Sequence, residues 1–333
     1  MKNIRVAISG YGAIGQQVAA LLLDRRQHYL ARYGVAVTLT GVCGSSAGLC
    51  DRNGLERDRL DVRGTYVPGL SGASFLECVE ADVLVEASPS DYQRGGPGFG
   101  YMMAALERGM HVIALSKCAL ALHYGALRDA ARRRAVTLKI SGATASALPT
   151  IDLLQYNLAG CRILSVEAIL TGTTNFILSE MMQHRVPLAE ALRAAQKMGL
   201  AESDPTLDID GWDTACKLAI LANAAFDADI DLRTMPRTGI GHVSLTQLNA
   251  WHKQRLTPRL VGRLERDGDS VQACVELQLY DAAHPFAQVQ GRTKAIRVVA
   301  EPMGEFTVIG GASHPLATAA AALKDFEHIL SAL

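Results

Sequence analysis

The chain has 333 residues, in which 33 lysines and arginines balance 33 aspartates and glutamates, so its formal net charge at pH 7 is zero. This balance gives no general attraction to nucleic acid or to anionic membranes, and we expect neither as a partner. With 49% hydrophobic and 20% charged residues the composition is that of a globular protein, and the length suggests about two domains.

The first part of the chain alternates apolar strand-like runs with helical patterns. A strand at 4–8, a glycine turn at 9–15 and a helix from Val18 lead to a second strand at 35–42, which completes a βαβ unit. The alternation continues through further strands and helices, at 82–87, 102–108, 111–115, 127–134 and 136–140. It predicts an α/β fold with a Rossmann-type, doubly wound, mainly parallel sheet, in a dinucleotide-binding domain over residues 1–148.

The pattern changes after Pro149. Strand-like and helical stretches now follow one another without regular alternation, at 163–170, 189–198, 214–225, 271–279 and 296–300. They predict a second, α+β catalytic and dimerisation domain over residues 149–305. A strand-like run and an alanine-rich helix follow, and we expect this C-terminal segment, 306–333, to return to the nucleotide-binding domain.

Three glycines, in the pattern Gly10-x-Gly12-x-x-Gly15, come directly after the first strand and open the first helix. In that context the first glycine permits a tight turn, the second lets the backbone approach a pyrophosphate, and the third lets helix and strand pack closely. The helix N-terminus then attracts the phosphate charge. The alternative is a tight turn that binds no ligand.

The end of the second strand bears on the choice of dinucleotide. An NAD-preferring site usually has an acid there to hold the ribose hydroxyls. Here the segment 42–46 contains no acid, and Arg52 is the nearest cation. This favours NADP over NAD without excluding NAD.

An acidic loop marks the second domain, because five acids fall within the twelve residues 202–213. The loop leads into a helix on which Asp213 and Lys217 share a face at the i, i+4 spacing. Such a loop can bind a cationic group. The alternative is a solvated ion pair with turn and capping residues around it.

Two strand ends carry further polar groups. Lys117 follows the strand at 111–115 and so stands at the carboxyl edge of the sheet, where ligands bind in this fold. The turn 171–175 offers hydroxyls and an amide after another strand. A solvated lysine and a helix cap are the alternatives.

Together these segments resemble the homoserine dehydrogenase family, in a short form for which we expect no C-terminal regulatory domain. The segments that carry the resemblance are the glycine turn, Ser116-Lys117, the run 171–178, the loop 201–208, and Gly211-x-Asp213-x-x-x-Lys217. The resemblance implies an oxidoreductase acting on a CH–OH group. It would reduce L-aspartate 4-semialdehyde reversibly to L-homoserine with NAD(P), in the biosynthesis of threonine and methionine.

The resemblance also implies roles for single residues. Lys217 would transfer the proton at the reacting oxygen, with Lys117 as its partner beside the nicotinamide and Asp213 in the same catalytic group. The implied substrate contacts are Glu202, for the ammonium group, with Asp208, Asp213 and Thr173. The implied cofactor contacts are Gly10, Gly12, Ala13, Ile14, Gly15, Ser88, Ser116, Lys117 and Gly310.

The chemistry itself calls for such lysines, since hydride delivery to an aldehyde builds negative charge on oxygen and needs a cation with a transferable proton. The dinucleotide supplies the hydride, so no covalent nucleophile is needed. We therefore expect Cys118 to be a packing residue.

The sequence departs from the family pattern in three places, one of which is the family's glycine-rich turn before Thr318-Ala319, only partly present in 310–314. The turn 141–149 lacks the carboxylate that the family associates with a monovalent cation, and Lys294 stands where the family often has Asn. These changes leave open a paralogous dehydrogenase for another small amino or hydroxy acid. A catalytically silent nucleotide-binding protein is the alternative from another class.

Cysteine and histidine usage bears on compartment and metals. The seven cysteines include no C-x-x-C pair, which argues against a disulfide framework and a thiolate zinc site. The nine histidines show no ligand spacing, so we expect no catalytic metal. Without room for a signal peptide or a membrane span, we expect a cytoplasmic protein, and from the resemblance a homodimer.

Overall fold

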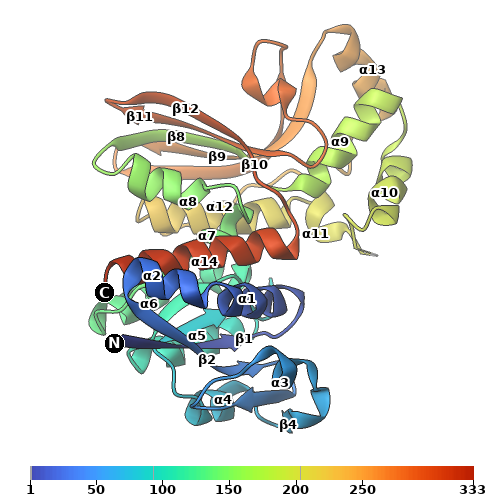
Figure 1. Ribbon diagram of the computed structural model, residues 1–333. Helices are drawn as coiled ribbons and strands as arrows, with labels where there is room; N and C mark the ends of the chain where they lie inside the picture. Colours follow the sequence, from blue (N-terminus) through green and yellow to red (C-terminus); the bar gives the residue numbers. More distant parts are fainter. Residues whose placement is uncertain (1, 93, 203) are drawn as a thin grey trace. The chain divides into compact units, whose positions relative to one another are not determined.

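The computed structural model describes residues 2–92, 94–202 and 204–333. The chain forms two compact units (Figure 1). Unit 1 is Met1–Ala147 with His314–Leu333, and unit 2 is Leu148–Ser313. None of the helices in the described part of the chain is long and apolar enough to cross a membrane.

Unit 1 is built on a seven-stranded sheet in the order β4-β3-β2-β1-β5-β6-β7. The parallel strands are β1 (Lys2–Ser9), β2 (Val35–Cys43), β5 (Val83–Glu86), β6 (His111–Ala114) and β7 (Leu138–Lys139). The antiparallel strands β3 (Ala47–Cys50) and β4 (Val67–Pro68) extend the β2 edge. The predicted doubly wound, mainly parallel sheet is thus confirmed, and it carries an antiparallel extension, β3 and β4, that was not predicted.

The helices of unit 1 connect and cover these strands. They are α1 (Ala13–Asp24), α2 (Arg26–Tyr33), α3 (Arg57–Asp61), α4 (Gly72–Cys78), α5 (Gly98–Glu107), α6 (Lys117–Arg133), α7 (Ser141–Ala145), the 3₁₀ turn η1 (Arg63–Thr65) and the C-terminal α14 (Pro315–Ser331). Apolar side chains of α14 share one core with α1, α2 and β1, and the Tyr29 and Phe326 rings meet edge to face at 5.3 Å. Burial of this apolar surface attaches α14 to the first unit.

Unit 2 is built on a five-stranded sheet in the order β10-β9-β8-β11-β12, and every pairing in it is antiparallel. The strands are β8 (Arg162–Ile169), β9 (Thr257–Asp267), β10 (Ser270–Tyr280), β11 (Lys294–Glu301) and β12 (Gly304–Gly310). The helices are α8 (Thr150–Asp152), the π-helical turn η2 (Leu153–Asn157), α9 (Gly172–His184), α10 (Leu188–Lys197), α11 (Thr206–Ile209), α12 (Trp212–Ala225), α13 (Leu245–Lys253) and the 3₁₀ turn η3 (Pro285–Gln288).

The two faces of the second sheet differ. Helix α12 packs on β9 at Gly262, where an added Cβ would lie only 3.0 Å from Leu218. Strand side chains alternate between faces, so Arg263 belongs to the opposite face. There it bonds Glu276 at 2.9 Å. One face is therefore packed with apolar side chains under a helix, and the other carries ion pairs.

The C-terminal segment departs from expectation. The run from 306 was expected to join the nucleotide-binding unit, but β12 pairs with β11 along its whole length and belongs to unit 2. Only the part from His314 onward joins unit 1. The hydrogen bonds of β12 satisfy its backbone on the second sheet, whereas the apolar face of α14 fits the first core.

Candidate active site

The glycine turn is shaped by close backbone contacts. Gly10 has φ +86°, and a Cβ there would lie 2.3 Å from the backbone of Ala87. A Cβ on Gly15 would lie 2.3 Å from the carbonyl oxygen of Gly10. Gly12, at the N-terminus of α1, has nothing within 4 Å of such an atom. Two of the glycines are thus required by the fold, and the space at Gly12 suits the close approach of a pyrophosphate.

A cavity of about 400 Å³ opens beside this turn, within unit 1. Its lining comes from the ends of β1, β2 and β5 and from α4 and α5: Gly10, Gly44, Ser45, Ser71, Gly72, Ala73, Leu76, Ser88, Pro89, Pro97, Gly100, Tyr101 and Ala104. None of these described lining residues is charged. The carboxyl ends of parallel strands are where dinucleotides bind in this fold, so the cavity and the open Gly12 together fit such a cofactor.

A buried carboxyl group lies under the predicted cofactor contacts. Glu86 ends β5 with no exposed surface and accepts a hydrogen bond from the Ser88 backbone at 2.8 Å. The hydroxyls of Ser88 and Ser116 also donate to it. Burial raises the pKa of this carboxyl above its ordinary value, against the lowering effect of these bonds. Glu86 was not among the predicted site residues, although an acid inside an apolar strand, with serines at two strand ends, was the available signal.

Lys117 begins α6, directly after β6. Its backbone N–H donates to the Ser90 hydroxyl at 3.1 Å, and its ammonium lies 3.5 Å from the Tyr92 hydroxyl. The predicted cofactor residues Ser116 and Lys117 therefore stand together at one strand end of unit 1.

In unit 2, Asp213 and Lys217 form a buried ion pair. Asp213 and Lys217 lie on successive turns of α12, and Lys217 Nζ donates to Asp213 Oδ2 at 2.5 Å. Their side chains are only 9% and 14% exposed, which rules out the solvated surface pair. The Thr171 hydroxyl donates to the same carboxylate oxygen at 3.0 Å, and Lys217 Nζ also donates to the Leu170 carbonyl at 3.0 Å. These bonds position the ammonium at the end of β8.

Hydrogen bonds attach the acidic loop to neighbouring helices. The Thr173 hydroxyl donates to the Leu200 carbonyl at 3.0 Å, and the Gln196 amide donates to the Glu202 carbonyl at 3.1 Å. The Glu202 side chain is exposed, and Asp208 is half-buried in α11. Both carboxylates are thus displayed on a loop that α9 and α10 hold in place.

The turn 171–175 is the start of α9, and it acts mainly on the neighbouring loop. The Asn175 side-chain nitrogen donates to the carbonyls of Val289, Gly291 and Thr293, at 3.2, 3.1 and 3.0 Å. The Thr171 hydroxyl bonds Asp213 and does not cap the helix. Thr171 thus orients the Asp213–Lys217 ion pair, whereas Asn175 fixes the loop that leads into β11.

The predicted site residues therefore gather in two groups. The glycine turn, Ser88, Ser116 and Lys117 belong to unit 1, while Glu202, Asp208, Asp213, Lys217 and Thr173 belong to unit 2. Gly310 also belongs to unit 2, where it pairs with Lys294 at the end of β12. The convergence of Lys117 and Lys217 stays a prediction.

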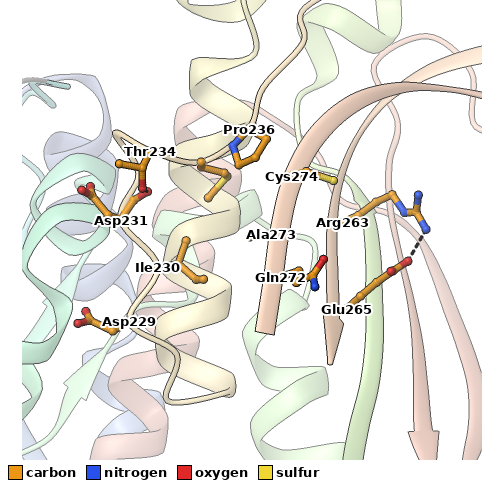
Figure 2. Close-up of a pocket in the computed structure, with 11 residues that line it drawn as sticks. Asp229, Ile230, Asp231, Thr234, Pro236, Arg263, Glu265, Gln272, Ala273 and Cys274 are labelled. Carbon is orange, nitrogen blue, oxygen red and sulfur yellow. Dashed lines mark hydrogen bonds and ion pairs between the residues drawn. The ribbon is translucent and has the colours of Figure 1, made fainter. Parts of the chain in front are cut away.

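A second cavity, of about 470 Å³, lies in unit 2 between the segment 229–236 and strands β9 and β10 (Figure 2). Asp231 and Thr234 line one side, and Arg263, which bonds Glu265, lines the other. None of the predicted site residues lines it.

Comparison with known proteins bears on both units. Residues 10–140 match the model of the homoserine dehydrogenase NAD-binding domain, and residues 149–326 match the homoserine dehydrogenase model.

Named relatives cover nearly the whole chain. A protein of Pseudomonas canavaninivorans, named NAD(+)-dependent homoserine dehydrogenase, is 32% identical over 99% of this chain and 97% of its own length. The homoserine dehydrogenase of Methanocaldococcus jannaschii is 31% identical over 97% of this chain and 98% of its own.

Solved structures agree. The homoserine dehydrogenase of Thiobacillus denitrificans is 25% identical, with a TM-score of 0.86 over 99% of this chain and 74% of that one. The S. aureus homoserine dehydrogenase is 27% identical, with a TM-score of 0.81 over 100% of this chain and 77% of that one. The chain therefore belongs to the homoserine dehydrogenase family, whose members are NAD(P)-dependent oxidoreductases acting on a CH–OH group.

Proposed function

We propose that this chain catalyses the reversible, NAD(P)-dependent reduction of L-aspartate 4-semialdehyde to L-homoserine. The observation that carries the proposal is the buried Lys217–Asp213 pair. A lysine ammonium has three donors, and Lys217 gives one to Asp213 and one to the Leu170 carbonyl. The remaining donor is available for a substrate oxygen.

Proton transfer would follow from this arrangement. As hydride reaches the aldehyde carbon, charge builds on the oxygen, and Lys217 donates a proton to it; in the reverse direction it accepts the hydroxyl proton. Asp213 holds the lysine in place, and Lys117 supplies a second positive charge at the reacting oxygen.

The dinucleotide would bind in unit 1. The backbone around Gly12, Ala13 and Ile14 would face the pyrophosphate, between the required glycines Gly10 and Gly15. Ser88 and Ser116 would lie near the nicotinamide half, and Gly310 would supply a further contact. The bound cofactor supplies the hydride, and the chain supplies position and charge.

Neither coenzyme is strongly selected in this proposal. The lining of the 400 Å³ cavity offers no acid to repel a 2′-phosphate and no cation to attract one. The missing acid after β2 still favours NADP, while the name of the Pseudomonas relative specifies NAD. We expect turnover with both, with kcat/KM values within roughly tenfold of each other, which is about 1.4 kcal/mol.

The amino-acid part of the substrate would bind the acidic loop. Glu202 would accept hydrogen bonds from the ammonium group, and Asp208, Asp213 and Thr173 would complete the polar contacts. An exposed carboxylate on an anchored loop suits a cationic group, because a carboxylate can accept charge-assisted hydrogen bonds from it.

We also propose the domain bounds, the assembly and the cellular location of the protein. We take 1–147 together with 314–333 as the dinucleotide-binding domain, 148–313 as the catalytic and dimerisation domain, and a homodimer built through this second domain as the assembly. We place the protein in the cytoplasm.

Steady-state assays test the function directly. Purified protein is given L-homoserine with NAD or NADP, and the reduced nicotinamide is followed by its absorbance. Turnover with homoserine is expected. Turnover with a related hydroxy acid but none with homoserine would favour the paralogous dehydrogenase, and coenzyme binding without any hydride transfer would favour the silent nucleotide-binding protein.

A further inference from the structure

A second lysine lies close to the catalytic pair within unit 2. Lys294 is the first residue of β11, and it is only 1% exposed. Burial of a lysine is costly unless its charge is compensated or removed, so a fully buried one next to a proton-transfer site calls for an explanation.

The strand register places Lys294 beside Lys217. Ala295, which follows Lys294 on β11, pairs with Ile169 of β8. Because the two strands are antiparallel, Lys294 stands across from Leu170, which follows Ile169. The Leu170 carbonyl is the one that holds the Lys217 ammonium. The two lysines therefore approach the same end of β8 from two sides.

Contacts with α9 hold the loop that leads to Lys294. Asn175 holds this loop through hydrogen bonds to three of its carbonyls, the last of which is that of Thr293. A Cβ on Gly172 would lie 2.8 Å from the Arg292 carbonyl, so the loop also packs closely against the start of α9. The Lys294 ammonium itself lies 3.5 Å from the Ala312 carbonyl. Lys294 thus enters the site from a rigid backbone.

The charged groups around Lys294 come mainly from α12. Asp213 and Lys217 both act on it, the first favouring its protonated form and the second opposing it. Gly310 pairs with it from β12, and on the preceding loop the Arg292 guanidinium lies 3.4 Å from the Ser313 carbonyl. Burial, reinforced by the Lys217 charge, lowers the pKa of Lys294 to about 7. Its charge therefore changes in the neutral range.

We propose that Lys294 is a positioning residue that acts through the Lys217–Asp213 pair: when protonated it shares the Asp213 carboxylate and makes Lys217 a stronger proton donor. The inference rests on the proposed function, because it assigns Lys217 the proton transfer. Like charges close together disfavour each other, so adding a proton to Lys294 eases the loss of one from Lys217.

The signature is a step between two non-zero rates. In the direction of aldehyde reduction, the single-turnover rate of hydride transfer at saturating NADPH or NADH should fall by roughly threefold to tenfold as pH rises through about 7. A residue that only supports the fold would not produce such a step.

Two substitutions each fix the charge at position 294. Lys294→Arg keeps a permanent charge, because arginine does not deprotonate in proteins, and should hold the fast rate across pH 6 to 8, about the neutral range. Lys294→Met removes the charge and should hold the slow rate. Lys253→Met, at the exposed end of α13, is the matched control and should keep the wild-type step. A step near pH 7 that persists in Lys294→Met, or equal flat rates in both variants, would overturn the proposal.

A measurement without turnover covers the case in which a variant does not fold. In protein labelled with ¹³C at lysine Cε, one resonance should titrate near pH 7 in the wild type and remain in Lys253→Met. If no lysine titrates between pH 6 and 8, about one unit around neutrality, the proposal is wrong. This readout needs no substrate. A protein inactive toward homoserine but with the titrating lysine would therefore contradict the proposed function and leave the Lys294 charge state intact.

Discussion

The two groups of site residues are built from different materials. The cofactor cradle of unit 1 consists of glycine backbone and hydroxyl groups in a cavity whose described lining carries no charge. The group in unit 2 consists of charged side chains held in a buried ion pair with a second lysine nearby. Shape therefore decides binding in the first, and charge decides chemistry in the second. Substitutions should separate the two: changes in the glycine turn of unit 1 should alter coenzyme affinity, and changes in the Lys217–Asp213 pair of unit 2 should alter the rate of hydride transfer.

The largest effect is expected at Lys217. Replacing it with methionine removes the proton donor and keeps the aliphatic stem, so kcat for homoserine oxidation should fall by roughly 10²- to 10⁴-fold. The coenzyme dissociation constant, measured by nicotinamide fluorescence, should stay within about twofold. Such a split assigns Lys217 to chemistry.

Lys197 on α10 offers a matched control, because it is an exposed lysine outside the site. Lys197→Met should leave both quantities unchanged. If Lys217→Met weakened coenzyme binding as much as it slowed turnover, the separation between the units would be lost.

The next effect distinguishes two glycines of the same turn. Gly15→Ala puts a Cβ 2.3 Å from the Gly10 carbonyl, where no side chain can yield, so it should lower the free energy of unfolding by about 2 to 3 kcal/mol. Gly12→Ala meets nothing within 4 Å in the chain itself and should leave stability unchanged within about 0.5 kcal/mol.

Gly12→Ala should instead weaken coenzyme binding. Its added methyl occupies the space where the backbone would approach the pyrophosphate, so the coenzyme dissociation constant should rise by roughly tenfold or more. Chemical denaturation and coenzyme titration of both variants measure the two effects. Unchanged coenzyme affinity in Gly12→Ala would contradict the placement of the phosphates at this turn.

The difference between the units also explains what the sequence could predict. Strand, glycine turn and helix leave a local signal, because Gly10 and Gly15 are required by backbone sterics. The i, i+4 spacing of Asp213 and Lys217 likewise predicts their contact. Burial of that pair could not be predicted, since it depends on packing of α12 against distant strands.

Long-range pairing hid other elements. Strand β9 was missed because Pro258, Gly262 and several charges interrupt its apolar pattern, and the buried Arg259 among them bonds the Phe286 carbonyl at 3.1 Å. The helical nature of 172–184 was hidden by the polar turn that begins it. The environment of Lys294 likewise arises only when β11 pairs with β8.

The smallest effect concerns Glu86, a buried acid at the base of the cofactor contacts. Its pKa is raised in the folded protein by burial, so the folded state holds the proton more tightly than the unfolded chain does. This contribution to stability is fully present below the ordinary pKa of about 4.5 and is lost as pH rises through the folded-state pKa. Glu86→Gln keeps the shape without titrating: its amide oxygen can accept from one serine while its amide nitrogen donates to the hydroxyl oxygen of the other, so it should remove this dependence. The unfolding free energy of the variant relative to wild type should therefore rise with pH when it is measured from about pH 5 to 7, a range above the ordinary pKa. Urea denaturation at several pH values measures the difference. A constant difference across this range would mean that Glu86 is ionised in the fold, and that the cradle of unit 1 is not the uncharged binding surface that separates it from unit 2.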